Sequence, residues 1–114
     1  MSIANHVRAE MTAVIARHGV MVGLFVGDKE VSGPEYERLT VEWTEAQEID
    51  GVVFSENVNR MLFSDHGAER TVDRFALFDA DGGFVGDWPM LKPRTLEDRD
   101  QTLIRVGELK IGMP

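Results

Sequence analysis

Two apolar runs, residues 75–78 and 84–88, flank the sequence Asp-Ala-Asp-Gly-Gly at residues 79–83. Asp tolerates the left-handed backbone region and Gly enters it without steric cost, so this spacing predicts a β-hairpin. Two strands alone are marginally stable in water. We therefore expect the rest of the chain to supply the sheet to which the hairpin belongs.

Residues 2–18 carry the clearest helical periodicity in the chain. Apolar residues recur there at spacings of three and four, at Ile3, Val7, Met11, Val14 and Ile15. This spacing places them on one stripe of a helix. Ser2 is the expected N-cap and Gly19 the expected C′ residue. Arg17 and His18 fall in the last turn, where positive charge complements the helix dipole.

From residue 19 the pattern changes to that of strands. Residues 19–27 form a short run rich in β-branched residues, which predicts a buried strand. Residues 28–35 are polar and contain Gly33-Pro34, so a loop is expected there. Residues 36–43 alternate, which predicts a half-buried antiparallel strand. Its two faces would carry Leu39, Val41 and Trp43 on one side and Arg38, Thr40 and Glu42 on the other.

The remaining elements are short and separated by turn residues. We expect an acidic connection at 45–50 ending in the turn Asp50-Gly51, strands at 52–55 and 59–63, a turn at 65–67, a proline-punctuated stretch at 88–93, and strands near 95–96 and 102–111 with a bulge or bend at Gly107. Seven or eight short strands at this spacing favour a sandwich or a barrel. The predicted fold is mainly β: one domain over residues 1–114, with an N-terminal helix at 2–18 and a jelly-roll-like antiparallel β-sandwich at 20–112.

Charge and composition exclude several classes of protein. The 114 residues include 20 acidic and 12 basic side chains, for a formal net charge of −8. Such a surface repels phosphate backbones and anionic lipids, so neither nucleic acid nor membrane is expected as a partner. The chain has no cysteine, which excludes disulfides and thiolate metal sites.

Membrane insertion and secretion are not indicated either. The longest apolar run, residues 19–27, is about half of the roughly 20 residues needed to cross a bilayer. The first residues lack the ordered regions of a secretory signal. The sequence predicts a soluble protein made in the cytoplasm.

The pair Asp79 and Asp81, followed by Gly82, could begin a calcium-binding loop, because carboxylates two residues apart can face one hard cation. Such a loop closes with a glutamate at its twelfth position, where this chain has Met90. A hairpin turn is the better explanation.

Hydrolytic chemistry is suggested only by residue type. Ser64, Asp65 and His66 have the residue types of a catalytic triad. Three neighbours in sequence, however, do not converge in space as a triad requires, and the chain has no Gly-x-Ser-x-Gly motif. We expect a polar loop. His6, His18 and His66 are too scattered for a metal site, and the first two should lie on the exposed side of the helix.

Other polar and aromatic groups have structural explanations. Five glutamates are expected to form a solvated rim, although two of them could meet as an acid/base pair: Glu35, Glu37, Glu42, Glu45 and Glu48. No phosphate-binding glycine motif is present. Four aromatic residues could line a ligand pocket but are better explained as core: Trp43, Trp88, Phe75 and Phe78. The sequence thus predicts no catalytic residue, cofactor or metal ligand, which favours an assembly protein over an enzyme.

The order of motifs resembles a family of small virion proteins of tailed bacteriophages, often labelled phage tail fibre or minor capsid protein. The resemblance begins with the N-terminal helix and Val22-Gly23-Leu24-Phe25, then Gly33-x-x-Tyr36-x-Arg38, Leu39-Thr40-Val41 and Asn57 before Met61-Leu62-Phe63. Its most specific part is Phe75-Ala76-Leu77-Phe78-Asp79-Ala80 with Gly82-Gly83, Pro89-Met90-Leu91 and Pro93-Arg94-Thr95-Leu96. Asp100-x-Thr102-Leu103 and Gly107-x-Leu109-x-Ile111 complete it. This chain differs in having charged and shorter loops.

The resemblance implies a non-enzymatic β-sandwich protein of the virion. The first expectation is a capsid decoration protein, a trimer or dimer that binds the major capsid protein and stabilises the shell. The alternative is a tail fibre or baseplate component. In either place, exposed sheet edges and the apolar face of the helix are the expected contact surfaces. Competing hypotheses are a small-ligand-binding protein or enzyme of the β-barrel type, and a bacterial protein that binds a partner chain outside any virion.

Overall fold

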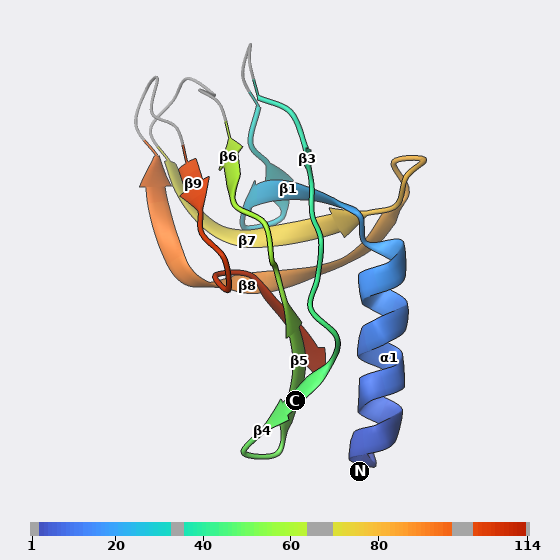
Figure 1. Cartoon of the computed structure of the whole chain (residues 1–114). Coiled ribbons are helices and arrows are strands. Elements are labelled where there is room, and N and C mark those ends of the chain that lie inside the picture. The colour runs from blue at the N-terminus through green and yellow to red at the C-terminus, as the bar shows by residue number, and fades with distance from the viewer. Residues whose placement is uncertain (1–2, 33–35, 64–69, 97–101, 114) are drawn as a thin grey trace.

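The structure, a computed structural model, describes residues 3–32, 36–63, 70–96 and 102–113. Its fold is mainly β, with antiparallel strand pairing and one helix (Figure 1). The elements are α1 (Asn5–His18), β1 (Met21–Val26), β2 (Lys29–Glu30), β3 (Leu39–Thr40), β4 (Gln47–Ile49), β5 (Val52–Glu56), β6 (Met61–Phe63), β7 (Arg70–Phe78), β8 (Phe84–Leu96), β9 (Thr102–Ile104) and β10 (Lys110–Met113).

The strands form three sheets. The largest has the order β2-β1-β7-β8, and β3 also pairs with β1. A three-stranded sheet has the order β10-β5-β4, and β6 pairs with β9 in a third. Elements far apart in the sequence are therefore neighbours: β10 lies beside β5, and the helix α1 packs against both (Figure 1).

The hydrophobic core contains residues from each of these sheets. Its fully or nearly buried members are Val22, Leu24, Val31, Val41, Met61, Phe63, Val72, Phe75, Leu77, Met90, Ile104, Leu109 and Ile111. They come from β1, β6, β7, β8, β9 and β10 and from the segments beside them. Burial of such side chains contributes about 1.5–3 kcal/mol each, which makes this cluster the main source of stability.

The predicted hairpin is confirmed. β7 pairs with β8, with Phe75 opposite Trp88 and Phe78 opposite Phe84. Asp79 forms the turn: its Oδ1 accepts hydrogen bonds from the backbone N–H groups of Asp81 at 2.9 Å and Gly83 at 2.8 Å. Gly82 has a φ of 86°, the left-handed conformation that the sequence predicted for this turn.

Two segments predicted as connections contain strands. Lys29 and Glu30 form β2, which pairs back onto β1 through the turn at Gly27 and Asp28, so the loop prediction for 28–35 was wrong for its first half. The acidic connection at 45–50 contains β4, which pairs with β5 around Asp50-Gly51. Both turn residues have positive φ, as that predicted turn requires. Their polar composition misled the prediction, because both strands lie at sheet edges and are largely exposed.

The proline-containing segment was also predicted wrongly. β8 continues without interruption from Phe84 to Leu96, through Pro89 and Pro93. Proline is tolerated because β8 is the edge strand of its sheet, where a missing N–H costs no ladder hydrogen bond. At the other end, the predicted strand at 102–111 is two strands, β9 and β10, separated by a turn in which Gly107 has a φ of 82°.

Other strands follow the prediction closely. β1 lies within the run predicted at 19–27. β5 covers the strand predicted at 52–55 and extends one residue beyond it, and β6 is the second half of the strand predicted at 59–63. Of residues 36–43, only β3 and an isolated bridge between Trp43 and Asn57 are paired, but the predicted alternation holds: Val41 is buried, whereas Thr40 and Glu42 are exposed. The turn predicted at 65–67 lies outside the described residues.

The helix forms with different ends from those predicted. It begins at Asn5; the N-cap is Ala4, which makes no side-chain cap, and the predicted cap Ser2 lies outside the described residues. Gly19 is the C-cap, but its φ is −84°, so it does not adopt the left-handed conformation expected of a C′ glycine. Within the described residues, no helix has the length and apolar character needed to cross a bilayer.

Candidate functional site

An apolar groove of about 520 Å³ lies between the β10-β5-β4 sheet and strand β8. Its lining consists of Ile49, Val52, Phe54, Trp88, Pro89, Leu91, Lys110 and Gly112. Three of these apolar side chains are open to solvent, with exposed fractions of 55% for Ile49, 48% for Val52 and 60% for Leu91. Large exposed apolar side chains gathered in one concave surface indicate a binding site.

Strand alternation explains why these residues share one face. Along β5, Val52 and Phe54 line the groove, whereas Val53 and Ser55 point to the other side of the sheet. The register continues this face across the neighbours, because Ile49 pairs with Val52 and Gly112 pairs with Phe54. The three strands thus present one continuous apolar surface.

Among the described residues that line the groove, Lys110 is the cation. Its Nζ lies 4.7 Å from the centroid of the Phe54 ring and 3.9 Å from Oε2 of Glu56. The ammonium group thus sits over an aromatic face with a carboxylate beside it, an arrangement that holds the charge at the rim. An occupant of the groove would meet an apolar floor and a positive edge.

The four aromatic residues proposed as core or pocket divide between the two roles. Phe75 and Phe78 are buried, as the core hypothesis predicted. Trp43 packs partly against the core, and its Nε1 donates to the carbonyl of Gly19 at 2.9 Å. Trp88 stacks on Phe75 with ring centroids 5.9 Å apart and also lines the groove. One member of the predicted set therefore connects the core to the candidate site.

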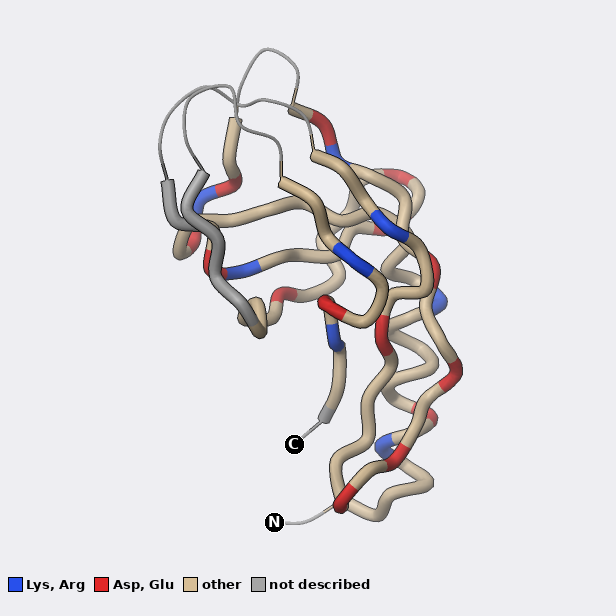
Figure 2. Tube along the Cα trace, turned by 60° about the vertical axis from the view of Figure 1, so that its left-hand side comes forward, with Lys and Arg blue, Asp and Glu red and all other residues tan. Residues whose placement is uncertain are grey.

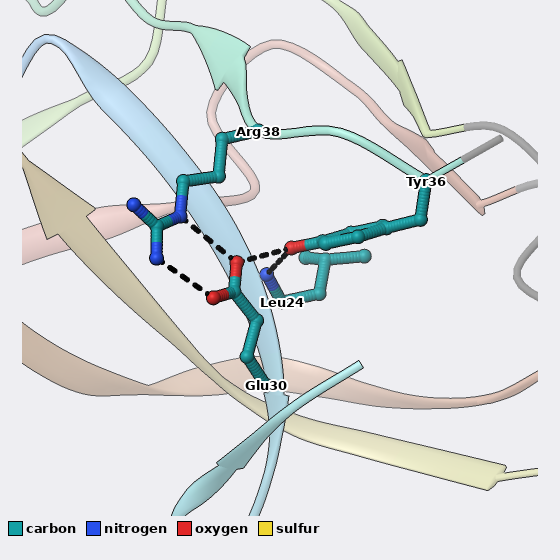
Figure 3. A network of polar contacts seen from close by, with 4 residues as sticks. All are labelled: Leu24, Glu30, Tyr36 and Arg38. Carbon is teal, nitrogen blue, oxygen red and sulfur yellow. Dashed lines mark hydrogen bonds and ion pairs between the residues drawn. The ribbon is translucent and has the colours of Figure 1, made fainter. Parts of the chain in front are cut away.

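A second feature is a polar cluster beside β1, formed by Glu30, Tyr36 and Arg38 (Figure 3). The Arg38 guanidinium donates from Nε to Oε2 of Glu30 at 3.1 Å and from Nη2 to Oε1 at 2.9 Å. The Tyr36 hydroxyl donates to Oε2 of Glu30 at 2.7 Å and accepts from the backbone N–H of Leu24 at 3.0 Å. The guanidinium also lies 3.4 Å from the centroid of the Phe78 ring.

These contacts shift the pKa of each group. Burial raises the pKa of Glu30, but the hydrogen bonds from Arg38 and Tyr36 and the positive charge of Arg38 outweigh it, so the net shift is downward from 4.5. Burial, followed by the hydrogen bond to Glu30, raises the pKa of Tyr36 above its ordinary value of 10.0. The hydrogen bond to Glu30 raises the pKa of Arg38. Each group is held in its ordinary ionisation state at neutral pH.

The cluster is suited to holding the fold together rather than to catalysis. Both Glu30 oxygens and the Tyr36 hydroxyl are engaged within the cluster, so neither is poised to exchange a proton with a substrate. What the cluster does is fasten β2 and the segment before β3 to the backbone of β1 at Leu24. A bidentate Arg–carboxylate pair of this kind fixes geometry as well as adding stability.

The polar residues weighed from the sequence do not converge where the structure describes them. The segment containing Ser64, Asp65 and His66, and also Glu35, lies outside the described residues. His6 and His18 are exposed on α1, as predicted, and so are Glu37, Glu42, Glu45 and Glu48. In the described ranges, His, Asp and Glu side chains do not gather into a group of three that could hold a metal ion. Figure 2 shows Lys and Arg interspersed with Asp and Glu along the trace.

Sequence reasoning found neither the groove nor the polar cluster. Ile49 lies in the segment predicted as an acidic connection, and Val52 follows just after it. Leu91 lies in the segment predicted to be interrupted by prolines. Their shared face depends on strand register, which the sequence does not give. For the cluster a signal existed: Tyr36 and Arg38 are two residues apart in an extended segment, so they can point the same way.

Comparison of the chain with protein-family models, with curated proteins and with solved structures gave no match.

Proposed function

We propose that this chain is a non-enzymatic structural protein of a tailed-bacteriophage particle, and that it binds a neighbouring protein through the apolar groove. The groove is the observation that carries the proposal, because its exposed apolar floor is stabilised only when another surface covers it. The resemblance to small virion proteins supplies the setting. We propose the capsid as the more suitable place, with the major capsid protein as partner, and the tail fibre or baseplate as the alternative.

The mechanism in either place is assembly by many small contacts. A protein of 114 residues offers limited surface to each neighbour, so each contact is weak. When copies are joined in a dimer or trimer, the second and later contacts become intramolecular, and total affinity rises without any new kind of contact. The shared core between antiparallel sheets fits a β-sandwich architecture, which we propose as the framework that carries the groove.

A second candidate is binding of a small apolar ligand. The groove volume of about 520 Å³ is in the range of ligand pockets, and Lys110 at the rim would suit a carboxylate head group. A ligand that binds the folded state raises the melting temperature with concentration. A series of fatty acids of increasing length would reveal such binding as a melting temperature that rises with chain length and falls back in a Lys110→Gln variant.

Particle labelling tests the virion proposal. A tagged copy of the chain would be expressed during phage growth, and purified particles would be examined by immunogold labelling and cryo-electron microscopy. Label distributed over the head supports capsid decoration, and label confined to the tail supports the fibre or baseplate alternative. Purified particles that carry no label overturn the virion proposal.

A matched pair of variants tests whether the groove attaches the protein to the particle. Leu91→Asp places a carboxylate in the groove, whereas Val58→Asp places one at an exposed apolar residue outside it. We expect the first variant to lower the number of copies per particle by about tenfold or more and the second to leave it unchanged. Equal occupancy of the two variants would contradict a role for the groove in attachment.

A further inference from the structure

The helix α1 turns three residues of its apolar stripe, called the outward stripe below, away from the sheet on which it packs. Val7, Met11 and Val14 have exposed fractions of 36%, 38% and 44%. The shielded side of the helix instead carries small or polar residues and one larger apolar side chain: Arg8, Ala9, Thr12, Ile15 and Ala16. A helix whose only role was to pack on the core of its own chain would bury its apolar stripe and expose its polar side.

The contact between helix and sheet accordingly buries polar groups. Thr12 on α1 and Ser55 on β5, the strand against which α1 packs, are both fully buried. Neither hydroxyl, nor Nε of Arg8, has a hydrogen-bond partner among the described residues. Burying such groups costs free energy that rotating the apolar stripe inward would avoid. We therefore interpret the outward stripe as a contact surface for another molecule.

The stripe and the groove face opposite directions. Val53, Ser55 and Glu48 lie on the α1 side of the β10-β5-β4 sheet, and the Nδ2 of Asn5 on the helix donates to Oε1 of Glu48 at 2.7 Å. The alternate residues, Val52 and Ile49 among them, line the groove on the other side. Figure 1 shows α1 running alongside β5 and β10, with β8 crossing above them in this view. Each molecule thus has a convex apolar surface on one side and a concave one on the other.

We propose that the occupant of the groove is the helix α1 of a second copy of this chain. An amphipathic helix entering an apolar groove through residues spaced i, i+4 and i+7 is a common mode of recognition, and Val7, Met11 and Val14 have that spacing. The stripe spans about 10 Å along the helix. This inference rests on the proposed role of the groove in protein binding, but not on the particle to which the protein belongs. It names a second copy as the neighbouring protein that fills the groove, and it leaves the contact with a capsid or tail protein to the exposed sheet edges.

One charge pair fits this arrangement. Glu10 is exposed on the helix beside Met11, and Lys110, whose Nζ lies 3.9 Å from Oε2 of Glu56, is at the rim of the groove. The helix as a whole is not acidic, because it also carries Arg8 and Arg17. At long range, by contrast, two copies with a net charge of −8 each repel one another. Because salt screens that repulsion beyond about 8–10 Å, self-association is expected to strengthen as salt concentration rises toward physiological values.

Contact between two different surfaces is head-to-tail. Such contacts close into rings of three or more copies when the rotation between neighbours permits, and otherwise extend into filaments. Each contact uses one short helix and is therefore weak, so closure of the ring would supply most of the stability. The arrangement gives an oligomer while leaving other sheet edges available for a further partner.

Complementation between two variants tests the arrangement. Met11→Asp disables the helix stripe, and Leu91→Asp disables the groove. Each variant alone should be monomeric in sedimentation-velocity analysis, with self-association weakened by about tenfold or more. An equal mixture retains one intact helix and one intact groove, so it should form dimers and nothing larger. Wild-type chain that stays monomeric at about 0.1 mM in physiological salt, or a mixture that does not dimerise, overturns the proposal.

The absence of cysteine permits a direct second test. Under mild oxidation, a mixture of Met11→Cys and Val52→Cys should give a cross-linked dimer containing one copy of each variant. A mixture of Met11→Cys and Val58→Cys is the control and should give none. Cross-linking of Met11→Cys only with itself would overturn the proposal in favour of helix-to-helix pairing. If Met11→Asp fails to fold by circular dichroism, Val14→Lys replaces it in the complementation. These results concern self-association, whereas particle labelling decides the proposed function.

Discussion

The side-chain amide of Asn57 holds the backbone of Leu109, 52 residues away in sequence, through a hydrogen bond of 2.9 Å from the Leu109 N–H to Asn57 Oδ1. The amide nitrogen donates to the carbonyls of Asn59 at 2.9 Å and Arg105 at 3.0 Å. Asn57 is fully buried, and both ends of its amide are thus paired. The residue acts as a bridge between the end of β5 and the turn before β10.

Replacing Asn57 by alanine should therefore be strongly destabilising. The variant leaves the buried Leu109 N–H without its acceptor, and we expect a loss of about 2–4 kcal/mol in the free energy of unfolding. Asn59→Ala is the control, because the partners of that amide, the Thr40 carbonyl and the Glu42 N–H, are exposed and can bind water instead. Urea denaturation of both variants measures the difference, and equal losses would contradict the bridging role.

Stability should depend on pH through Glu30. Its pKa is lower in the folded chain than its ordinary value of 4.5, so the stabilisation is present above that value and is lost as pH falls through the folded pKa. In Glu30→Gln we expect lower stability at pH 7 and a flatter decline below pH 5 than in the wild type. Glu42→Gln, at an exposed carboxylate, serves as the control. A decline in Glu30→Gln as steep as that of the wild type would exclude this carboxylate as a source of the pH dependence.

The turn at Asp79 should tolerate an amide but not a methyl group. Asp79→Ala removes the acceptor for two backbone N–H groups and should cost about 1 kcal/mol. Asp79→Asn keeps an oxygen acceptor in the same place and should cost only a few tenths of that amount. Thermal melts of the two variants provide the measurement. Similar melting temperatures would mean that the side chain does not support the hairpin.

Gly19 is needed for space rather than for backbone freedom. A Cβ atom at this position would lie 2.6 Å from Cδ1 and 2.9 Å from Cβ of Leu77, which is fully buried. Gly19→Ala should therefore destabilise the protein by about 1–3 kcal/mol through overpacking. The same change in a Leu77→Ala background should cost less, because the Cδ1 atom at 2.6 Å is gone while the Cβ atom of residue 77 remains. Additive effects in this double-mutant cycle would rule out the steric explanation.

The sequence predicted those elements whose signals are local. The hairpin at Asp79 and the turn at Asp50-Gly51 depend on residues that are neighbours in the chain, and both formed as expected. β2 and β4 were missed because edge strands are polar, and the path of β8 was missed because an edge position tolerates proline.

The candidate site could not be predicted in the same way. The groove brings Ile49, Leu91 and Lys110 together from three separate strands through register and sheet packing, which no local pattern contains. The apolar stripe of α1 was visible in the sequence and was expected to make contacts with a partner. Its exposure at Val7, Met11 and Val14 agrees with that expectation, whereas the partner itself remains a proposal.

The pairing of β5 with β10 has a consequence for biosynthesis. Helix α1 is translated well before part of the surface on which it packs, because that surface includes Lys110–Met113. The helix therefore cannot reach its native position while those residues are still inside the ribosomal exit tunnel. Contacts of such large sequence separation slow folding. Until then the nascent chain would expose β5 and the side of α1 that packs on it, and chaperones bind such transiently exposed surfaces.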